Sequence, residues 1–189
     1  MNLPHWPGWH LVGRYDSDVG SWLLHHEGEA LLLEVPEGLP VADVQASLTQ
    51  LGSPRLCYIT ASHDHEDHID TDVWSALEQA FPKARLLHPT RVKGDKLLHL
   101  AGEPVYLVKA PKHSLCDVVT IFRGVAMTGD IELGMLESVN DEVPEATRRR
   151  SMRRLRGFPE RTGYHVHTTV SAHLNSVRQE IDWPALFSV

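Results

Sequence analysis

One run of six residues constrains the fold of this chain more than any other segment. Residues 63–68, His-Asp-His-Glu-Asp-His, hold three imidazoles and three carboxylates, and they directly follow the β-favouring run 55–60. A segment this polar does not enter a hydrophobic core, so it predicts a loop at the end of a strand. Imidazole and carboxylate are common ligands of divalent metal ions, and a strand end gives them a rigid support. The run therefore predicts a metal site at one edge of a sheet.

The spacing within this run predicts two ions rather than one. His63 and His65 lie two residues apart in an extended loop, so their rings can point the same way. Asp67 and His68 lie beyond a turn and are better placed to hold a second ion beside the first. The competing interpretation is an ordinary solvated surface loop. Such a loop has no reason to place histidine at three of six positions directly after a strand.

Further candidate ligands follow three later predicted strands. Histidine is frequent, at 13 of 189 residues, and His113 and His173 each lie at the end of a strand. Asp130 closes another strand at the Gly129 turn. His167 is the alternative to His173 as the last ligand. We favour His173, because only the end of its strand reaches the metal edge.

The remaining pattern predicts strands and helices in a mixed order. Alternating and apolar runs predict strands, beginning with an antiparallel meander, over 9–15, 21–25, 30–35, 55–60, 84–87, 104–108, 118–122, 125–128 and 164–171. Helical spacing predicts helices over 41–51, between Asp70 and Pro82, over 145–156, and in a last segment that carries Leu174, Val177 and Ile181. This order predicts two sheets with helices outside them.

Composition bounds the class of protein. The length suits a single domain over 1–189, and no apolar stretch approaches the roughly 18 residues of a membrane span. Two cysteines cannot build a disulfide framework, and no secretion signal is evident, so we expect a cytoplasmic protein with no membrane partner. Eighteen basic against 25 acidic residues leave a net charge of −7, which argues against a surface that attracts nucleic acid everywhere.

The run 63–68 resembles the HxHxDH motif of the metallo-β-lactamase superfamily. The order of the later candidates, a single His, an Asp in a TGD-like turn and a last His, is also similar to that family. The resemblance reaches from about Trp9 to Ile181. It implies an α+β fold, an αββα sandwich of two mixed β-sheets flanked by helices, with the metals at one edge.

The same resemblance implies a ligand set. His63, His65 and His113 would hold the first ion, and the second would be held by Asp67, His68 and His173. Asp130 would bridge both ions. Asp67 and Asp130 are the residues to which it assigns catalytic roles. Zn²⁺ is the expected metal, although Fe and Mn accept the same donors.

The sequence departs from the family pattern at three places. In the family, an early strand often ends in Asp, and this chain has Glu34 at that position. The sequence therefore does not predict which side chains contact and orient the metal ligands. Ser-Leu-Cys-Asp follows His113 in place of a Pro and Gly pattern, and His173 lacks the flanking glycines. Cys116, three residues after His113, is an alternative metal ligand, because some members of the family use a Cys ligand.

Two divalent ions roughly 3.5–4 Å apart lower the pKa of a shared water toward neutrality, which predicts metal-assisted hydrolysis. We expect a hydrolase acting on a small ester, thioester, lactone or similar substrate. One alternative is a phosphodiesterase or nuclease, for which six arginines within Arg148 to Arg156 could bind phosphate; they could equally be the solvated face of a helix. Another is a non-catalytic metal-binding or redox module.

Near the start of the chain, three tryptophans have two possible positions. Trp6, Trp9 and Trp22 are either core residues or the wall of an apolar pocket over the metal site.

Overall fold

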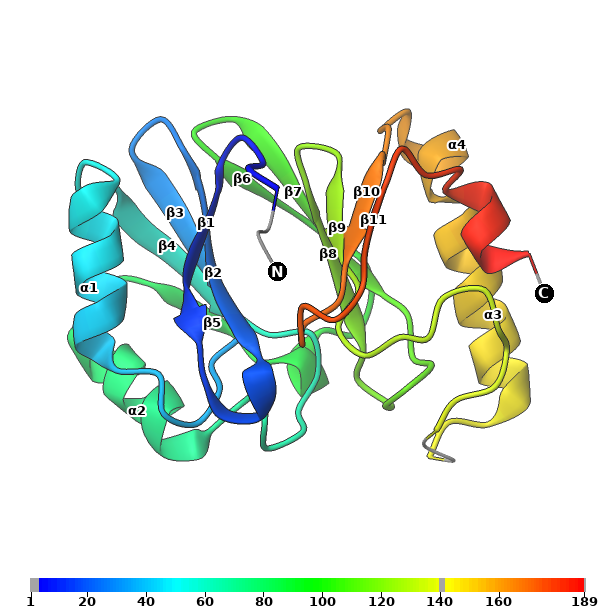
Figure 1. Cartoon of the computed structure of the whole chain (residues 1–189), viewed down its shortest axis with the longest axis horizontal. Helices are drawn as coiled ribbons and strands as arrows, with labels where there is room; N and C mark the ends of the chain where they lie inside the picture. Colours follow the sequence, from blue (N-terminus) through cyan, green and yellow to red (C-terminus); the bar gives the residue numbers. More distant parts are fainter. Residues whose placement is uncertain (1–3, 140–141, 189) are drawn as a thin grey trace.

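The computed structural model describes residues 4–139 and 142–188, and it has two β-sheets facing each other between two pairs of helices (Figure 1). The first sheet has the order β1-β2-β3-β4-β5. Its strands are β1 (Trp9–Arg14), β2 (Gly20–His26), β3 (Glu29–Leu33), β4 (Arg55–Thr60) and β5 (Arg85–Leu87). The first three strands pair antiparallel, as the predicted meander requires, and β3, β4 and β5 pair parallel.

Two helices cover the outer face of the first sheet: α1 (Val41–Gln50) and α2 (Thr71–Ala80). Val44 and Leu48 of α1 and Leu77 of α2 are buried against the side chains of β2, β3 and β4 that face outward. Asp70 caps α2, since its Oδ1 accepts a hydrogen bond of 2.8 Å from the amide of Val73. This cap also ends the loop that carries the histidine-rich run.

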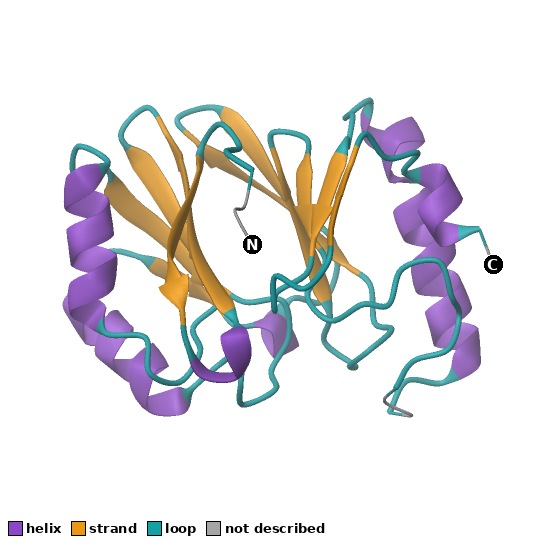
Figure 2. Ribbon diagram, viewed as in Figure 1, coloured by secondary structure: helices purple, strands orange, loops and turns teal. Residues whose placement is uncertain are grey.

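The second sheet has the order β11-β10-β9-β8-β7-β6, with only β9 and β10 parallel. Its strands are β6 (Lys96–Leu100), β7 (Glu103–Lys109), β8 (Val118–Phe122), β9 (Val125–Met127), β10 (Thr168–Val170) and β11 (Val177–Gln179). On its outer face lie α3 (Glu145–Arg156) and α4 (Phe158–Thr162), which pack through Met152, Leu155 and Phe158. Figure 2 shows these helices on the side of the strands opposite to α1 and α2. Both sheets are mixed, so the expected αββα architecture is confirmed.

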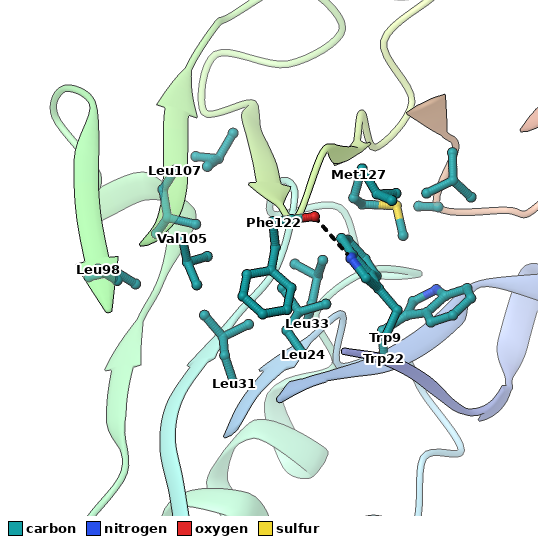
Figure 3. Close-up of a cluster of buried hydrophobic side chains, with 14 of the residues drawn as sticks. Trp9, Trp22, Leu24, Leu31, Leu33, Leu98, Val105, Leu107, Phe122 and Met127 are labelled. Atoms are coloured by element: carbon teal, nitrogen blue, oxygen red, sulfur yellow. Dashed lines mark hydrogen bonds between the residues drawn. The ribbon is translucent and has the colours of Figure 1, made fainter. Parts of the chain in front are cut away.

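Between the sheets lies the largest hydrophobic cluster (Figure 3). Trp9 and Trp22 of the first sheet are 3–5% exposed and pack edge to face, with ring centroids 5.8 Å apart. The indole of Trp9 donates a hydrogen bond of 3.1 Å to the carbonyl oxygen of Phe122 in β8, which ties the two sheets together. Trp6 joins the same cluster. Of the two interpretations of these tryptophans, the core is therefore confirmed and the pocket wall over the metal site is wrong.

The end of the chain differs from the prediction. The predicted strand 164–171 is reduced to β10, and the predicted last helix is wrong, because Val177 pairs with Val170 in the antiparallel ladder of β10 and β11. Leu174 has a φ of 55°, which reverses the chain between these strands, and its side chain is buried between the sheets. Leu174 and Ile181, which the prediction placed on one stripe of a helix, pack into two different hydrophobic clusters.

Three short elements add to the helices and strands above: the 3-10 helices η1 (Asp16–Asp18), η2 (Pro89–Arg91) and η3 (Pro184–Phe187). β6, α4 and these three 3-10 helices have no counterpart among the predicted elements. Within the described ranges, every helix is too short or too polar to cross a lipid bilayer.

Candidate metal centre

The candidate ligands lie where strands from both sheets end, at the lower edge of the molecule in Figure 1. The run 63–68 follows β4, and His113 follows β7. Asp130 follows β9 and His173 follows β10, two neighbouring parallel strands whose carboxyl ends share one edge. Two sheets thus bring side chains that are distant in the sequence to one place.

The structure brings all seven predicted ligands into two groups. Within each group, one potential ligand atom per residue lies within 4.8 Å of the others. The first group is His63, His65 and His113, and the second is Asp67, His68, Asp130 and His173. These are the two sets that the resemblance implies, with Asp130 placed in the second.

Asp130 lies between the two groups. Its Oδ2 is 3.4 Å from Nε2 of His68 and 3.2 Å from Nε2 of His173 in the second group. The same oxygen is 4.0 Å from Nε2 of His63 and 3.9 Å from Nε2 of His113 in the first group. One carboxylate oxygen therefore faces four imidazoles, which is the position that a bridging ligand needs.

The donor atoms have the chemistry that a divalent cation needs. Nε2 of His68 and Oδ1 of Asp130 are buried and have no hydrogen-bond partner in the described part of the chain. Nε2 of His63 and Nδ1 of His65 face each other at 3.0 Å. Buried polar atoms normally have a hydrogen-bond partner or bind an ion. A cation would provide the missing partner for Nε2 of His68 and Oδ1 of Asp130. Imidazole nitrogen with carboxylate oxygen suits Zn, Fe or Mn.

The electrostatics of the cluster favour the metal-binding forms of His63 and Asp130, whereas His68 holds a proton that a bound cation would displace. Burial, with the neighbouring His68, lowers the pKa of His63 to about 2, so its ring is neutral, the form in which an imidazole can bind a metal ion. Burial opposes the ionisation of Asp130, but the hydrogen bonds of His173 and His68 outweigh it and hold its pKa below the usual range. Burial likewise disfavours the charged form of His68, yet the carboxylates of Glu34 and Asp130 raise its pKa to about 10.

Glu34 supports the second group from behind. It is fully buried, with a φ of 68°, and its carbonyl accepts a hydrogen bond of 2.8 Å from the hydroxyl of Ser21. One carboxylate oxygen accepts from the amide of Ser62 at 3.1 Å, and the other lies 3.3 Å from Nδ1 of His68. When His68 donates its Nδ1 proton to Glu34, its Nε2 is free to bind a metal. The departure from Asp to Glu therefore keeps a carboxylate behind a ligand.

Asp117 builds the loop that presents His113. Its Oδ2 accepts hydrogen bonds of 2.8, 2.6 and 2.9 Å from the amides of Lys112, His113 and Ser114. Its Oδ1 accepts one of 2.7 Å from the hydroxyl of Ser114. These four hydrogen bonds hold the backbone of residues 112–114 in place. The loop after His113 is therefore ordered by Asp117, although it lacks the Pro and Gly of the family pattern.

Lys112 and Glu132 were also missed by sequence analysis, which had no spacing signal for them. Lys112 is fully buried, and its Nζ donates to Oε2 of Glu132 at 2.8 Å and to the carbonyl of Glu137 at 2.7 Å. Oε1 of Glu132 accepts from the amide of Val139 at 2.9 Å and lies 3.9 Å from Nδ1 of His113. The pair thus joins the His113 loop to the segment after Asp130.

The alternative ligands lie outside both groups. His167 packs against the Gly124 turn and contacts the hydroxyl of Thr168 at 2.9 Å. His173, in contrast, donates to the carbonyl of Ser17 through Nδ1 at 2.7 Å and turns Nε2 toward Asp130. Cys116 is buried and donates through Sγ to Oδ1 of Asp64 at 2.8 Å. The structure therefore places His173, rather than His167 or Cys116, in the cluster.

Comparisons with known proteins agree on the fold. Neither protein-family models nor curated protein sequences give a match. Among solved structures, ETHE1 from Myxococcus xanthus superposes with a TM-score of 0.64 at 16% identity, over 90% of this chain and 79% of that one. The BLEG-1 B3 metallo-β-lactamase gives 0.62 at 15%, over 90% and 93%.

A third similar structure is the metallo-β-lactamase family protein TTHA1429 from Thermus thermophilus, with a TM-score of 0.61 at 17% identity, over 95% of this chain and 77% of that one. Identities this low establish a shared fold rather than a shared activity. The two mixed sheets, the order of the strands and the edge at which the candidate ligands meet agree with that result. The chain has the metallo-β-lactamase fold.

Proposed function

We propose that the protein is a hydrolase that holds two divalent metal ions and cleaves an ester, thioester, lactone or similar small acyl compound. The observation that carries the proposal is the position of Asp130, whose Oδ2 lies within 4.0 Å of imidazole nitrogens from both ligand groups. A carboxylate in this position offsets the mutual repulsion of two cations held side by side. The metallo-β-lactamase fold supports the same interpretation by analogy.

In this proposal the chain supplies the ligands and keeps them oriented. His63, His65 and His113 would hold one ion, and Asp67, His68 and His173 would hold the other, with Asp130 available to both. When bound, such ions lower the pKa of water toward neutrality and polarise the carbonyl oxygen of the substrate. Hydrolysis then adds the hydroxyl of water to the acyl carbon, breaks the bond to the leaving oxygen or sulfur, and gives that atom a proton.

Asp67 and Asp130 are the two carboxylates of the centre, and they differ in exposure. The side chain of Asp67 is 30% exposed and that of Asp130 is 18% exposed. Oδ2 of Asp67 lies 3.7 Å from Nε2 of His68 and 3.5 Å from Nε2 of His173. Oδ2 of each carboxylate therefore faces Nε2 of His68 and Nε2 of His173, and Asp67 is the more exposed of the two.

The metal and the compartment complete the proposal. Zinc is our first choice, because borderline nitrogen and oxygen donors suit it, and iron and manganese are the alternatives. A cytoplasmic site of action is supported by Cys57 and Cys116, which are both buried and unpaired, since reducing compartments keep thiols free.

Phosphodiester hydrolysis has less support from the position of the arginine-rich helix. α3 lies on the outer face of the second sheet, and none of its arginines lines the cleft beside the candidate ligands. Several arginines there already have partners: Arg149 pairs with Glu145 at 2.8 Å, and Arg154 with Asp95 at 2.9 Å. These positions and pairings support the interpretation of the arginines as the solvent-exposed face of α3.

The proposal is tested by metal analysis combined with a substrate panel. The purified protein, incubated with zinc, iron or manganese and desalted, should hold two ions per chain by elemental mass spectrometry. It should then hydrolyse members of a panel of esters, thioesters and lactones, lose that activity with a chelator, and regain it with the metal. A protein that binds no metal refutes the proposal. Full loading without turnover favours the non-catalytic module, and turnover of phosphodiesters alone favours the nuclease.

A further inference from the structure

Two cavities flank the candidate metal centre, and they differ in charge. The first has a volume of 440 Å³, begins at His113, Asp130 and His173, and reaches Arg178 in β11. The second has a volume of 520 Å³ and includes Asp67 in its wall. Its other acidic lining residues are Asp16, Glu37, Glu66, Asp70 and Asp72, and no lysine or arginine is among the described residues that line it. A charged substrate therefore meets a different potential on each side of the centre.

Arg178 gives the first cavity an unpaired positive charge. It is exposed, and no carboxylate among the described residues lies within ion-pairing distance of it. Thr169 is its cross-strand partner in β10 and lines the same cavity, so both side chains are on one face of the sheet. Arg178 is also the sole lysine or arginine among the described lining residues.

The carboxylates of the first cavity are already engaged. Asp130 faces the imidazoles of the candidate ligands, with Nε2 of His173 at 3.2 Å. Glu132 is paired with the ammonium of Lys112 at 2.8 Å. Neither acid is within 4.0 Å of the guanidinium of Arg178, since no such pair occurs in the described part of the chain. The charge of Arg178 therefore remains available to a ligand.

Part of the wall of this cavity is apolar. Ile131, Leu133, Met135 and Val139 line it, and Met135 and Val139 are 47% and 88% exposed. The hydrogen bond from the amide of Val139 to Glu132 holds this segment against the site. Large apolar side chains exposed beside a reactive centre are typical of a surface that binds apolar groups.

We propose that the substrate is an amphiphilic anion whose oxyanion group binds Arg178. This inference rests on the proposed hydrolase activity and names its substrate class. The acyl bond lies at Asp130 and His173, an apolar body packs on Leu133 and Met135, and a terminal carboxylate or phosphate pairs with the guanidinium. Guanidinium binds both oxyanions through two parallel hydrogen bonds. The acidic second cavity repels the same anion and so favours this orientation.

Matched substrates test the inference with the zinc-loaded protein. The panel consists of nitrophenyl hemiesters of dicarboxylic acids of increasing length, each with its neutral carboxamide counterpart and its phosphonate counterpart. For the anionic esters we expect Arg178→Gln to raise KM about tenfold, with kcat changed less than about twofold, because a charge-assisted hydrogen bond is lost at a distance from the reacting atoms. The neutral esters should be unaffected. The ratio of the carboxylate and phosphonate effects identifies the preferred oxyanion.

A charge-matched control separates local recognition from the overall field. Arg150→Gln removes the same charge from an exposed position on α3, outside the cavity, and should leave the KM of every ester unchanged. Arg178→Glu should reverse the preference, so that carboxamides become better substrates than carboxylates. Equal effects of Arg178→Gln on charged and neutral esters, or no effect on either, would overturn the inference.

A binding measurement keeps the inference separate from the proposed function. Titration calorimetry of the zinc-loaded protein should show that phenylbutanoate binds more tightly than phenylbutanamide, and that Arg178→Gln weakens only the former, by about tenfold. If this pattern holds while no ester is hydrolysed, the anion site stands and the proposed function fails. If esters are hydrolysed but Arg178→Gln changes neither binding nor KM, the function stands and the anion site fails.

Discussion

The ammonium of Lys112 and the carboxylate of Glu132 form an ion pair of 2.8 Å in which the lysine is fully buried. Lys112 directly precedes the candidate ligand His113, and Glu132 follows the candidate ligand Asp130 by two residues. Nζ of Lys112 also donates to the carbonyl of Glu137 at 2.7 Å. The pair thus connects the loops that carry two candidate ligands to the segment that forms the apolar wall of the cleft.

Removing one partner of this pair should destabilise the fold. Lys112→Met leaves the Glu132 carboxylate without its cation, and we expect the free energy of unfolding to fall by about 3 kcal/mol, at the low end for buried pairs because Glu132 is partly exposed. The double variant Lys112→Met with Glu132→Gln should lose less than the sum of the two single changes. Urea unfolding followed by circular dichroism measures all three. Additive losses would show that the two residues do not act as a pair.

Glu34 should control the metal affinity through His68. Glu34→Gln keeps the shape of the side chain, but its amide group can donate to Nδ1 of His68 and so place the proton of that ring on Nε2, which faces Asp130. We expect metal affinity to fall about 10- to 100-fold. Competition with a chromophoric chelator measures it. Glu78→Gln, an exposed change of the same charge on α2, is the control and should bind metal as the unaltered protein does.

The architecture and the candidate site could be predicted from sequence where the signal is local. The run 63–68 follows β4 as predicted, because its composition alone excludes it from a core. The helix predicted over 145–156 is α3, because Met152 and Leu155 repeat at helical spacing and are buried. In both cases a few neighbouring residues carry the whole physical argument.

The roles of Glu34 and Glu132 depend on contacts between distant segments, which no local pattern predicts. Glu34 reaches Ser62 across 28 positions, and Glu132 reaches Lys112 across 20. No periodicity marks such a contact, since it depends on which strands become neighbours. The segment 174–181 failed for a related reason: its helical spacing is equally compatible with the turn at Leu174 and the pairing of Val177 with Val170. The segment forms a strand rather than a helix because β10 lies beside it and pairs with it.

Loss of either ligand group should show in metal content. His65→Ala removes one nitrogen of the first group, and we expect metal and hydrolytic activity to be lost together, because two remaining imidazoles hold an ion weakly. Asp130→Asn removes the charge between the groups, so the two ions should be held less tightly and one should be lost on dialysis. Elemental analysis after dialysis measures both. His99→Ala, at an exposed position, is the control, and normal stoichiometry in His65→Ala would contradict the ligand assignment.

Cys116 should be unreactive in the folded protein until the pH is high. Burial, followed by its hydrogen bond to Asp64, raises the pKa of its thiol to about 12, so little of the reactive thiolate exists near neutral pH, and the fraction grows as the pH approaches that value. In a Cys57→Ser background, alkylation by iodoacetamide followed by mass spectrometry should be slow and should accelerate steeply with pH. Asp64→Asn removes the negative charge beside Sγ, lowers the pKa and should speed alkylation at the same pH. Because unfolding would also expose the thiol, circular dichroism of each variant is the control, and rapid alkylation of the folded protein near pH 8, below the usual thiol pKa of about 8.5, would contradict the prediction.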